Sequence, residues 1–216
     1  AGLLAQLRAR SVRSLDVLVL THGELDHAGT APELLAQVPV RLVLDGRAGL
    51  RSELSAQISA AIRACRCRSV RAQAGMRIGA GPLVLDVRSP LTPELPPGAN
   101  PNDYAIVLVA SAFSRTALLT ADAESPVLDR LDLPAVDLLK VSHHGSADAG
   151  LPEVLERTRP GMAVIEVGEH NRHGHPVPEV LTDLKTAGVP TWRTDRDGAV
   201  AFDLSRGATS VRPERP

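Results

Sequence analysis

Residues 15–27 read LDVLVLTHGELDH, an apolar run that leads into a short loop crowded with polar side chains. A run of Leu and Val of this length is typical of a buried strand. Within six residues the loop offers two imidazoles and two carboxylates, which belong to His22, Glu24, Asp26 and His27. Gly23 lets the backbone turn sharply between them. A buried strand followed by such a loop indicates a metal site at a strand end.

The seven histidines of the chain fall into three short windows and nowhere else. These windows hold His22 and His27, then His143 and His144, and finally His170, His173 and His175. Neutral imidazole and ionised carboxylate both donate lone pairs to transition metals, so the clustering favours a metal site. A helix-capping Asp26 with histidines on the surface is the alternative, and it would account for Asp26 alone.

Three further loops follow apolar strands and carry the same kinds of side chain. RTALLT leads to ADAE at 121–124, VDLLKV leads to SHHGS at 142–146, and AVIEVG leads to EHNRHGHP at 169–176. In α/β sheets, ligands gather at strand ends, where loops are free to carry polar groups. The four loops are therefore predicted to share one site.

The chain as a whole alternates short apolar runs with amphipathic segments, which predicts a layered α/β protein. Strands are predicted at 15–20, 40–45, 83–87, 104–110, 116–120, 136–141, 163–167, 190–193 and 199–203. Helices are predicted at 2–9, 30–37, 50–65, 125–131, 151–157 and 178–187. Pro32, Pro152 and Pro178 mark helix starts and Gly188 marks a helix end. Five prolines make 89–103 a surface loop, and 205–216 is predicted to be a disordered tail.

Composition bounds the possible functions. A chain of 216 residues predicts one domain, and its formal charge of −1 excludes a strong global attraction to nucleic acid. Its longest apolar runs fall well short of the roughly 20 residues that span a bilayer. The two cysteines, Cys65 and Cys67, cannot form a disulfide framework, and burial as small hydrophobic residues is favoured over metal ligation.

The loop motifs resemble those of one family. HxExDH at 22–27 resembles the HxHxDH signature of the metallo-β-lactamase superfamily, with Glu24 in place of the middle histidine. TADAE at 120–124 resembles the TGD motif, VSHHGS at 141–146 resembles KVxHHGS, and NRHGHP at 171–176 resembles NxxGHP. In this order they resemble the C-terminal metallo-hydrolase domain of ComEC-type DNA-uptake channel proteins, over about residues 3–203. The resemblance implies an αββα sandwich over 1–204 that lacks its N-terminal strands.

The resemblance also implies roles for the loop residues. The metal ligands would be His22 and Glu24 at one ion, Asp26, His27 and His144 at a second, and Asp122 between them. The substrate side would be lined by His143, His175, Ser146 and Asn171. The predicted catalytic residues are Asp26, Asp122, His143 and His175. The predicted substrate-binding residues are Ser146 and Asn171.

The chain departs from the family pattern at three positions. Relatives place a further histidine about twenty residues before the bridging Asp. This chain reads NPND there, at 100–103, and has no histidine. The metal site of His22 and Glu24 is therefore predicted to be weak or empty. Glu24 is a harder ligand than imidazole and shifts selectivity from Zn²⁺ toward Mn²⁺. Ala121 replaces the glycine beside Asp122. The expected cofactor is one or two divalent ions, Mn²⁺ or Zn²⁺.

The resemblance implies a metal-dependent phosphodiesterase or nuclease that degrades single-stranded DNA during uptake. The chain would then be an extracytoplasmic, soluble domain of a bacterial plasma-membrane protein, with the membrane-spanning channel of the same protein as its partner and no membrane insertion of its own. The absence of a GxSxG elbow agrees with metal-activated water as nucleophile. A hydrolase of a small phosphoester, lactone or thioester is the second hypothesis. A catalytically weakened structural or DNA-guiding channel domain is the third.

Overall fold

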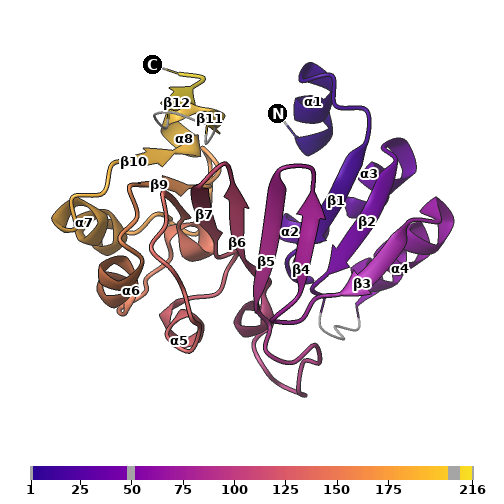
Figure 1. Cartoon of the computed structure of the whole chain (residues 1–216), viewed down its shortest axis with the longest axis horizontal. Coiled ribbons are helices and arrows are strands. Elements are labelled where there is room, and N and C mark those ends of the chain that lie inside the picture. Colours follow the sequence, from indigo (N-terminus) through magenta and orange to yellow (C-terminus); the bar gives the residue numbers. More distant parts are fainter. Residues whose placement is uncertain (1, 48–51, 204–209, 216) are drawn as a thin grey trace. The chain divides into compact units, whose positions relative to one another are not determined.

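The computed structural model describes residues 2–47, 52–203 and 210–215 (Figure 1). The chain divides into two compact units, and each is built from two separate stretches of sequence. Unit 1 comprises Ala1–Ala74 and Ser89–Ile106, and unit 2 comprises Gly75–Arg88 and Val107–Pro216. The long proline-rich segment after residue 89 therefore belongs to unit 1.

Unit 1 is a parallel sheet of the order β1-β2-β3, made of β1 (Leu15–Leu20), β2 (Val40–Asp45) and β3 (Arg68–Arg71). The helices of this unit are α1 (Leu3–Ala9), α2 (Leu25–Ala28), α3 (Ala31–Gln37) and α4 (Glu53–Cys65), with a 3₁₀ turn η1 at Pro101–Tyr104. α3 and α4 lie beside the sheet (Figure 1) and bury Leu34 and Ile58 against Leu20 and Val43. This apolar layer holds the end of β1 in place.

Unit 2 contains a seven-stranded sheet of the order β10-β9-β8-β7-β6-β5-β4. Its strands are β4 (Arg77–Ala80), β5 (Leu83–Ser89), β6 (Val107–Ala112), β7 (Arg115–Leu119), β8 (Leu138–Lys140), β9 (Met162–Ile165) and β10 (Thr191–Arg193). β7, β8, β9 and β10 run parallel to one another, whereas the β4–β5 and β6–β7 pairs are antiparallel. Because β7, β8 and β9 are parallel, the loops that follow them leave from the same edge of the sheet.

The helices of unit 2 are α5 (Ser125–Leu128), α6 (Leu151–Thr158), α7 (Pro178–Thr186) and α8 (Thr194–Asp197), with a 3₁₀ segment η2 at Ser142–Gly145. α6 and α7 pack side by side (Figure 1), and Val154, Leu155 and Leu184 bury their side chains in the same core as the sheet residues Leu139 and Ile165. This core supports the strand ends from which the polar loops emerge.

Every predicted helix and strand has a counterpart in the structure, and the α/β class is confirmed. Pro32, Pro152 and Pro178 occupy the first turns of α3, α6 and α7 as predicted. Gly188 follows α7 with a φ of +68°, and it donates to the Lys185 carbonyl at 3.0 Å, which is a glycine helix stop. The strand predicted at 104–110 begins only at Val107, because Tyr104 ends η1 and residues 105–106 are neither helix nor strand.

The prediction of a disordered tail over 205–216 is wrong for Ser210–Pro213. These residues form β12, which pairs antiparallel with β11 (Val200–Asp203). The pairing brings Val211 opposite Phe202. The Phe202 ring meets the Trp192 ring edge to face, with the two ring centroids 5.8 Å apart. Residues 205–209 and 216 of the predicted tail lie outside the described residues. A short apolar contact therefore orders a segment whose composition alone is polar.

Cys65 and Cys67 are joined by a disulfide across a single intervening residue. Both side chains pack against the apolar core of unit 1 but are only half-buried, so they are less buried than the sequence predicted. Their covalent pairing was not expected. It closes the C-terminal end of α4, where Arg66 adopts a left-handed φ of +53°.

Asp137, just before β8, gives a pH-dependent prediction for stability. Its carboxylate accepts from the Arg115 guanidinium at 2.7 Å and from the Thr116 backbone N–H at 2.8 Å. Burial alone would raise the pKa of Asp137, but these bonds outweigh it and hold the pKa below 3.8. Asp137→Asn is expected to cost about 1 kcal/mol at pH 7, since partial exposure screens the ion pair.

Because the native pKa of Asp137 is depressed, its contribution is complete above 3.8 and is lost as the pH falls through the native value. Urea unfolding at pH 7 and near pH 3 should therefore show the gap between wild type and Asp137→Asn shrinking on acidification. The exposed Asp132→Asn serves as the control. A gap that stays constant across this range would contradict the prediction.

Candidate metal centre

In unit 1, the loop that follows β1 gathers two histidines around one hydroxyl. The Thr21 Oγ1 atom lies 3.2 Å from His22 Nδ1 and 3.1 Å from His27 Nδ1, and the two ring centroids are 4.1 Å apart. His22 is buried, with 1% of its surface exposed. Metal-ligating histidines commonly hydrogen-bond through one ring nitrogen and ligate through the other. The Nδ1 contacts of both rings agree with that use.

The two carboxylates of this loop differ in their setting. Asp26 lies in the first turn of α2, and its Oδ2 is 3.8 Å from His27 Nε2. Asp26 does not cap α2, because the N-cap residue is Glu24. The Glu24 side chain is exposed and makes no capping hydrogen bond. Both carboxylates are therefore exposed, Asp26 by 59%, and Asp26 is the one that lies beside the His27 ring.

The loop after β2 packs directly against the histidine loop of unit 1. A Cβ at Gly46 would lie 2.3 Å from the Thr21 carbonyl oxygen, so only glycine fits there. Beside it, the Arg47 guanidinium makes a two-pronged ion pair with Asp45 at 2.9 and 2.8 Å and donates to the Ser55 carbonyl of α4 at 2.8 Å. This buried ion pair ties the end of β2 to α4 next to the histidines.

In unit 2, Asp122 follows β7 and has a side chain that is only 1% exposed. Each of its oxygens faces a different imidazole. Oδ2 lies 3.8 Å from His143 Nε2, and Oδ1 lies 3.8 Å from His144 Nε2. The backbone holds these loops together, since the His143 N–H donates to the Ala121 carbonyl at 3.0 Å.

The far side of each of these imidazoles is also engaged. His143 Nδ1 lies 2.8 Å from Glu124 Oε1, and His144 Nδ1 lies 2.6 Å from the Glu166 carbonyl oxygen. The Ser146 hydroxyl donates to the same Glu124 oxygen at 2.5 Å. Sequence reasoning assigned no role to Glu124. Its position two residues after Asp122 in a strand-end loop was the available signal.

The backbone of these loops is strained at three residues that are not glycine. Ala121 has a φ of +49°, His143 of +45° and His144 of +55°. Such left-handed conformations cost about 1–3 kcal/mol each and persist only where the surrounding structure enforces them. Ala121, which replaces the glycine of the family motif, is therefore accommodated in the left-handed region. Strain of this kind gathers at functional sites.

The NRHGHP loop places His175 near the other histidines of unit 2. Its ring centroid is 6.0 Å from that of His143, and it stacks on His173 at 5.9 Å. Burial, followed by the charges of His143 and His173, lowers the pKa of His175 below 6.5. Burial and the neighbouring imidazoles thus favour the neutral form of His175.

Asn171 fixes the backbone of His175. Its Oδ1 accepts from the His175 N–H at 3.0 Å, and its Nδ2 donates to the His175 carbonyl at 2.9 Å. The amide therefore clamps its own loop, and Ser146 likewise donates within the site. The roles of Asn171 and Ser146 toward substrate remain predictions.

Comparison with known proteins places this geometry in a family. The model of the metallo-β-lactamase superfamily matches residues 1–168, most of the chain. The chain belongs to this superfamily. The predicted metallo-β-lactamase fold is thereby confirmed, and members of the superfamily are generally metal-dependent hydrolases.

The curated metallo-β-lactamase relatives confirm the ComEC-type resemblance. The chain is 29% identical to ComE operon protein 3 of Bacillus subtilis and 26% identical to competence protein ComA of Neisseria gonorrhoeae, with 98% of the chain covered in both cases. Recombination protein 2 of Haemophilus influenzae is 26% identical over 93% of the chain. The chain spans 28%, 28% and 24% of the length of these three relatives.

Solved structures agree on the metallo-β-lactamase fold. YhfI of Bacillus subtilis, a metallo-β-lactamase fold protein, is 13% identical with a TM-score of 0.57, covering 98% of this chain and 84% of that one. The E377D mutant of CmlA β-hydroxylase gives a TM-score of 0.52 at 13% identity, with 84% and 43% covered. These likenesses concern the fold alone.

The donor set fits the divalent ion that the superfamily implies. Imidazole nitrogens and carboxylate oxygens are the ligands that Zn²⁺ and Mn²⁺ take in proteins. In unit 2 the Nε2 atoms of His143 and His144 lie on either side of Asp122, while their Nδ1 atoms are engaged elsewhere. Both cysteines are consumed by the disulfide, so thiolate ligation is not part of this site.

Gly145 gives a prediction about how this metallo-β-lactamase site is built. Its φ is +82°, and a Cβ there would lie 2.6 Å from Pro176 Cβ. Gly145→Ala is therefore expected to destabilise the fold by about 2 kcal/mol or more, from strain and overpacking together. Gly168→Ala, where nothing lies within 4 Å of the added Cβ, should change stability by about 0.5 kcal/mol or less. Equal thermal midpoints for the two variants would contradict this reading of the contact.

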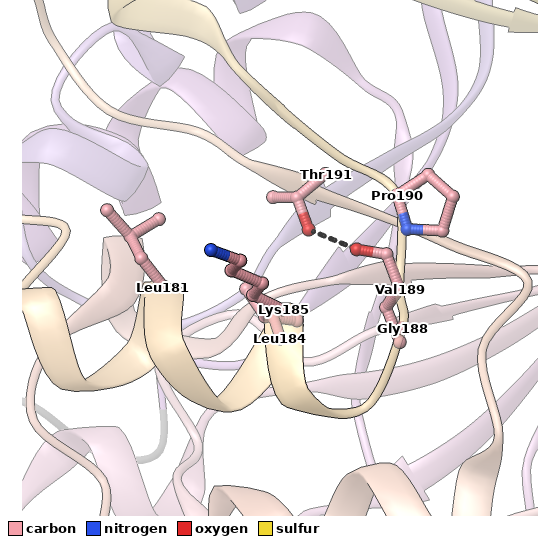
Figure 2. Close-up of a pocket in the computed structure, with 7 residues that line it drawn as sticks. All are labelled: Leu181, Leu184, Lys185, Gly188, Val189, Pro190 and Thr191. Atoms are coloured by element: carbon pink, nitrogen blue, oxygen red, sulfur yellow. Dashed lines mark hydrogen bonds between the residues drawn. The ribbon is translucent and has the colours of Figure 1, made fainter.

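A separate hollow in unit 2 lies away from the ligand-bearing loops. Figure 2 shows it at the end of α7, lined by Leu181, Leu184, Lys185, Gly188, Val189, Pro190 and Thr191. Pro190 precedes β10, so the hollow lies at the amino end of a strand, whereas the histidine loops leave the carboxyl ends of its parallel neighbours. The hollow therefore belongs to the opposite edge of the sheet.

Proposed function

We propose that the chain is a metal-dependent phosphodiesterase that hydrolyses single-stranded DNA. The observation that carries this proposal is the buried Asp122 carboxylate, with an imidazole Nε2 at 3.8 Å from each oxygen. When bound, divalent ions in such a site lower the pKa of water and clamp the attacking and leaving oxygens of a phosphodiester. The chain itself then has to hold the ions, orient the substrate and handle a proton.

The proposed ligands follow from the sequence motifs. They are His22, Glu24, Asp26 and His27 from the loop after β1, and Asp122 and His144 from unit 2. The Thr21 hydroxyl at the Nδ1 atoms of His22 and His27 supports the first group, and the Glu166 carbonyl at His144 Nδ1 supports the second. His175 is proposed to accept or deliver a proton on the substrate side, where its lowered pKa favours the neutral form.

DNA is proposed as substrate from the relatives and from local charge. Two relatives are named as a competence protein and a recombination protein. In unit 1 the exposed Arg63, Arg66 and Arg68 lie around the end of α4 and the start of β3, where they could contact phosphates. With four aromatic residues in the chain, base stacking contributes little, so arginines and metal ions would carry most of the binding.

The proposed setting is an extracytoplasmic domain whose partner is the membrane-spanning channel of the same parent protein. Among the residues described by the structure, no helix combines the length and the apolar character that crossing a bilayer requires. The chain matches 24–28% of the length of its relatives, which agrees with the proposal that it is one domain of a longer protein.

The test uses the purified chain with Mn²⁺ or Zn²⁺ and an end-labelled single-stranded oligonucleotide. Cleavage that EDTA abolishes and added metal restores would support the proposal. Activity confined to a small phosphodiester would instead support the second hypothesis, a small-ester hydrolase. Absence of divalent-ion binding in calorimetry would rule out both hydrolase functions.

A catalytically weakened, DNA-guiding domain is the third candidate. The exposed Glu24 side chain favours it, because Glu24 replaces an imidazole of the family motif and is not held by a capping bond. Oligonucleotide binding with no cleavage under any divalent ion would support this candidate and contradict the nuclease proposal.

A further inference from the structure

Asp122 is placed symmetrically between the two adjacent histidines of unit 2. The separation is 3.8 Å from Oδ2 to His143 Nε2 and 3.8 Å from Oδ1 to His144 Nε2. Two ligand atoms that each lie about 2.0–2.2 Å from one ion are at most about 4.4 Å apart. Both pairs meet this limit, so each oxygen of Asp122 can share an ion with its own histidine.

The hydrogen bonds on the far side of the rings are also matched. A carboxylate oxygen of Glu124 and a backbone carbonyl of Glu166 both act as acceptors, at 2.8 Å and 2.6 Å. Each acceptor favours the tautomer with the proton on Nδ1, which leaves the Nε2 lone pair on the side of Asp122. Ligating histidines are oriented in this way by carboxylates and carbonyls.

The Ser146 hydroxyl fixes the Glu124 side chain in turn, through its 2.5 Å bond to the same Oε1. Three residues from two loops are therefore arranged in series, from Ser146 through Glu124 to His143. The left-handed φ of +45° at His143 is the backbone conformation that presents the ring there.

We propose that His143 is a metal ligand on the Oδ2 side of Asp122, and that Glu124 is its positioning residue. This inference rests on the proposed function, and it moves His143 from the substrate side to the ion. The two adjacent histidines would then hold separate ions, one on each side of the Asp122 carboxylate.

The test measures metal binding rather than turnover. His143→Gly keeps the left-handed backbone that glycine tolerates and removes the imidazole. Glu124→Gln keeps the shape of the acceptor and removes its charge. Mn²⁺ calorimetry should show one site weakened at least about tenfold in His143→Gly and about 10- to 100-fold in Glu124→Gln. The exposed His170→Gly is the matched control and should bind as wild type does.

Co²⁺ gives a second readout, because its visible absorption depends on the number, type and arrangement of its ligands. A shifted Co²⁺ spectrum in His143→Gly would support ligation, and a spectrum and Mn²⁺ affinity identical to wild type would overturn it. Unchanged metal binding with lost DNA cleavage would also overturn it, and would return His143 to the substrate side. If neither the wild-type chain nor the His170→Gly control bound a divalent ion in calorimetry, the proposed function itself would be contradicted.

Discussion

Asp122→Asn is expected to reduce DNA hydrolysis by about a thousandfold or more. The substitution keeps the size of a side chain that is 1% exposed but replaces a negative oxygen with an N–H donor. An amide cannot bridge two cations, and the several kcal/mol of charge stabilisation that metal ions supply corresponds to a factor of this size. Cleavage rates at saturating Mn²⁺, together with metal content by elemental analysis, check the prediction.

The matched control for this variant is Asp132→Asn, which changes a fully exposed carboxylate in the same unit. It should retain wild-type cleavage and metal content. If Asp122→Asn held its metal and cut DNA at more than a tenth of the wild-type rate, Asp122 could not be the bridging ligand. Thermal unfolding of both variants would show whether any loss arises from the fold.

Asp45→Ala is expected to lower the free energy of unfolding by about 3–5 kcal/mol, the largest stability effect we predict. The Arg47 side chain is 6% exposed and Asp45 is 14% exposed, and two short bonds join them. Removing the carboxylate leaves a buried guanidinium without its counter-charge, which is strongly destabilising. Urea unfolding monitored by circular dichroism measures the loss.

Unit 1 also contains an exposed ion pair, which serves as the control for the buried one. Arg41 and Asp16 pair at 3.2 Å, but their side chains are 61% and 70% exposed. Asp16→Ala should therefore cost about 0.5 kcal/mol or less, because water screens exposed ion pairs. A double variant Asp45→Leu with Arg47→Met should recover much of the stability, since an apolar pair of similar volume can replace a buried ion pair. Equal losses for Asp45→Ala and Asp16→Ala would contradict this account.

The strands and helices that could be predicted are those with a clear apolar pattern. β1 and β2 are short runs rich in Leu and Val, and α7 buries Val180 and Leu184 one turn apart, so both patterns can be recognised in the sequence. β3 was missed because Arg68, Ser69 and Arg71 are exposed and only Val70 is apolar and partly buried. β12 was missed for a similar reason, since its pairing with β11 depends on a partner that the local pattern does not reveal.

The site was located by its motifs, but the roles within it depend on geometry. His143 and His144 are neighbours in sequence, and only the structure shows that they face different oxygens of Asp122. Glu124 was overlooked because a single carboxylate beside a helix start is common in any chain. The disulfide between Cys65 and Cys67 depends on the left-handed turn at Arg66, and an arginine does not predict such a turn.

The interleaving of the two units has a consequence for how the chain folds. The carbonyl of Thr21, just after β1, accepts a backbone hydrogen bond from Ile106, 85 positions later. The β4–β5 hairpin of unit 2 lies between these two residues in sequence, and it pairs with β6, which is synthesised after Ile106. Unit 1 cannot close during synthesis until its last stretch has left the ribosome, by which time a piece of unit 2 is already exposed. Such long-range closure slows folding and leaves strand edges open to misassociation. Truncation at any single point also cannot yield an intact half, so expressing either unit alone requires rejoining its two stretches with a designed linker.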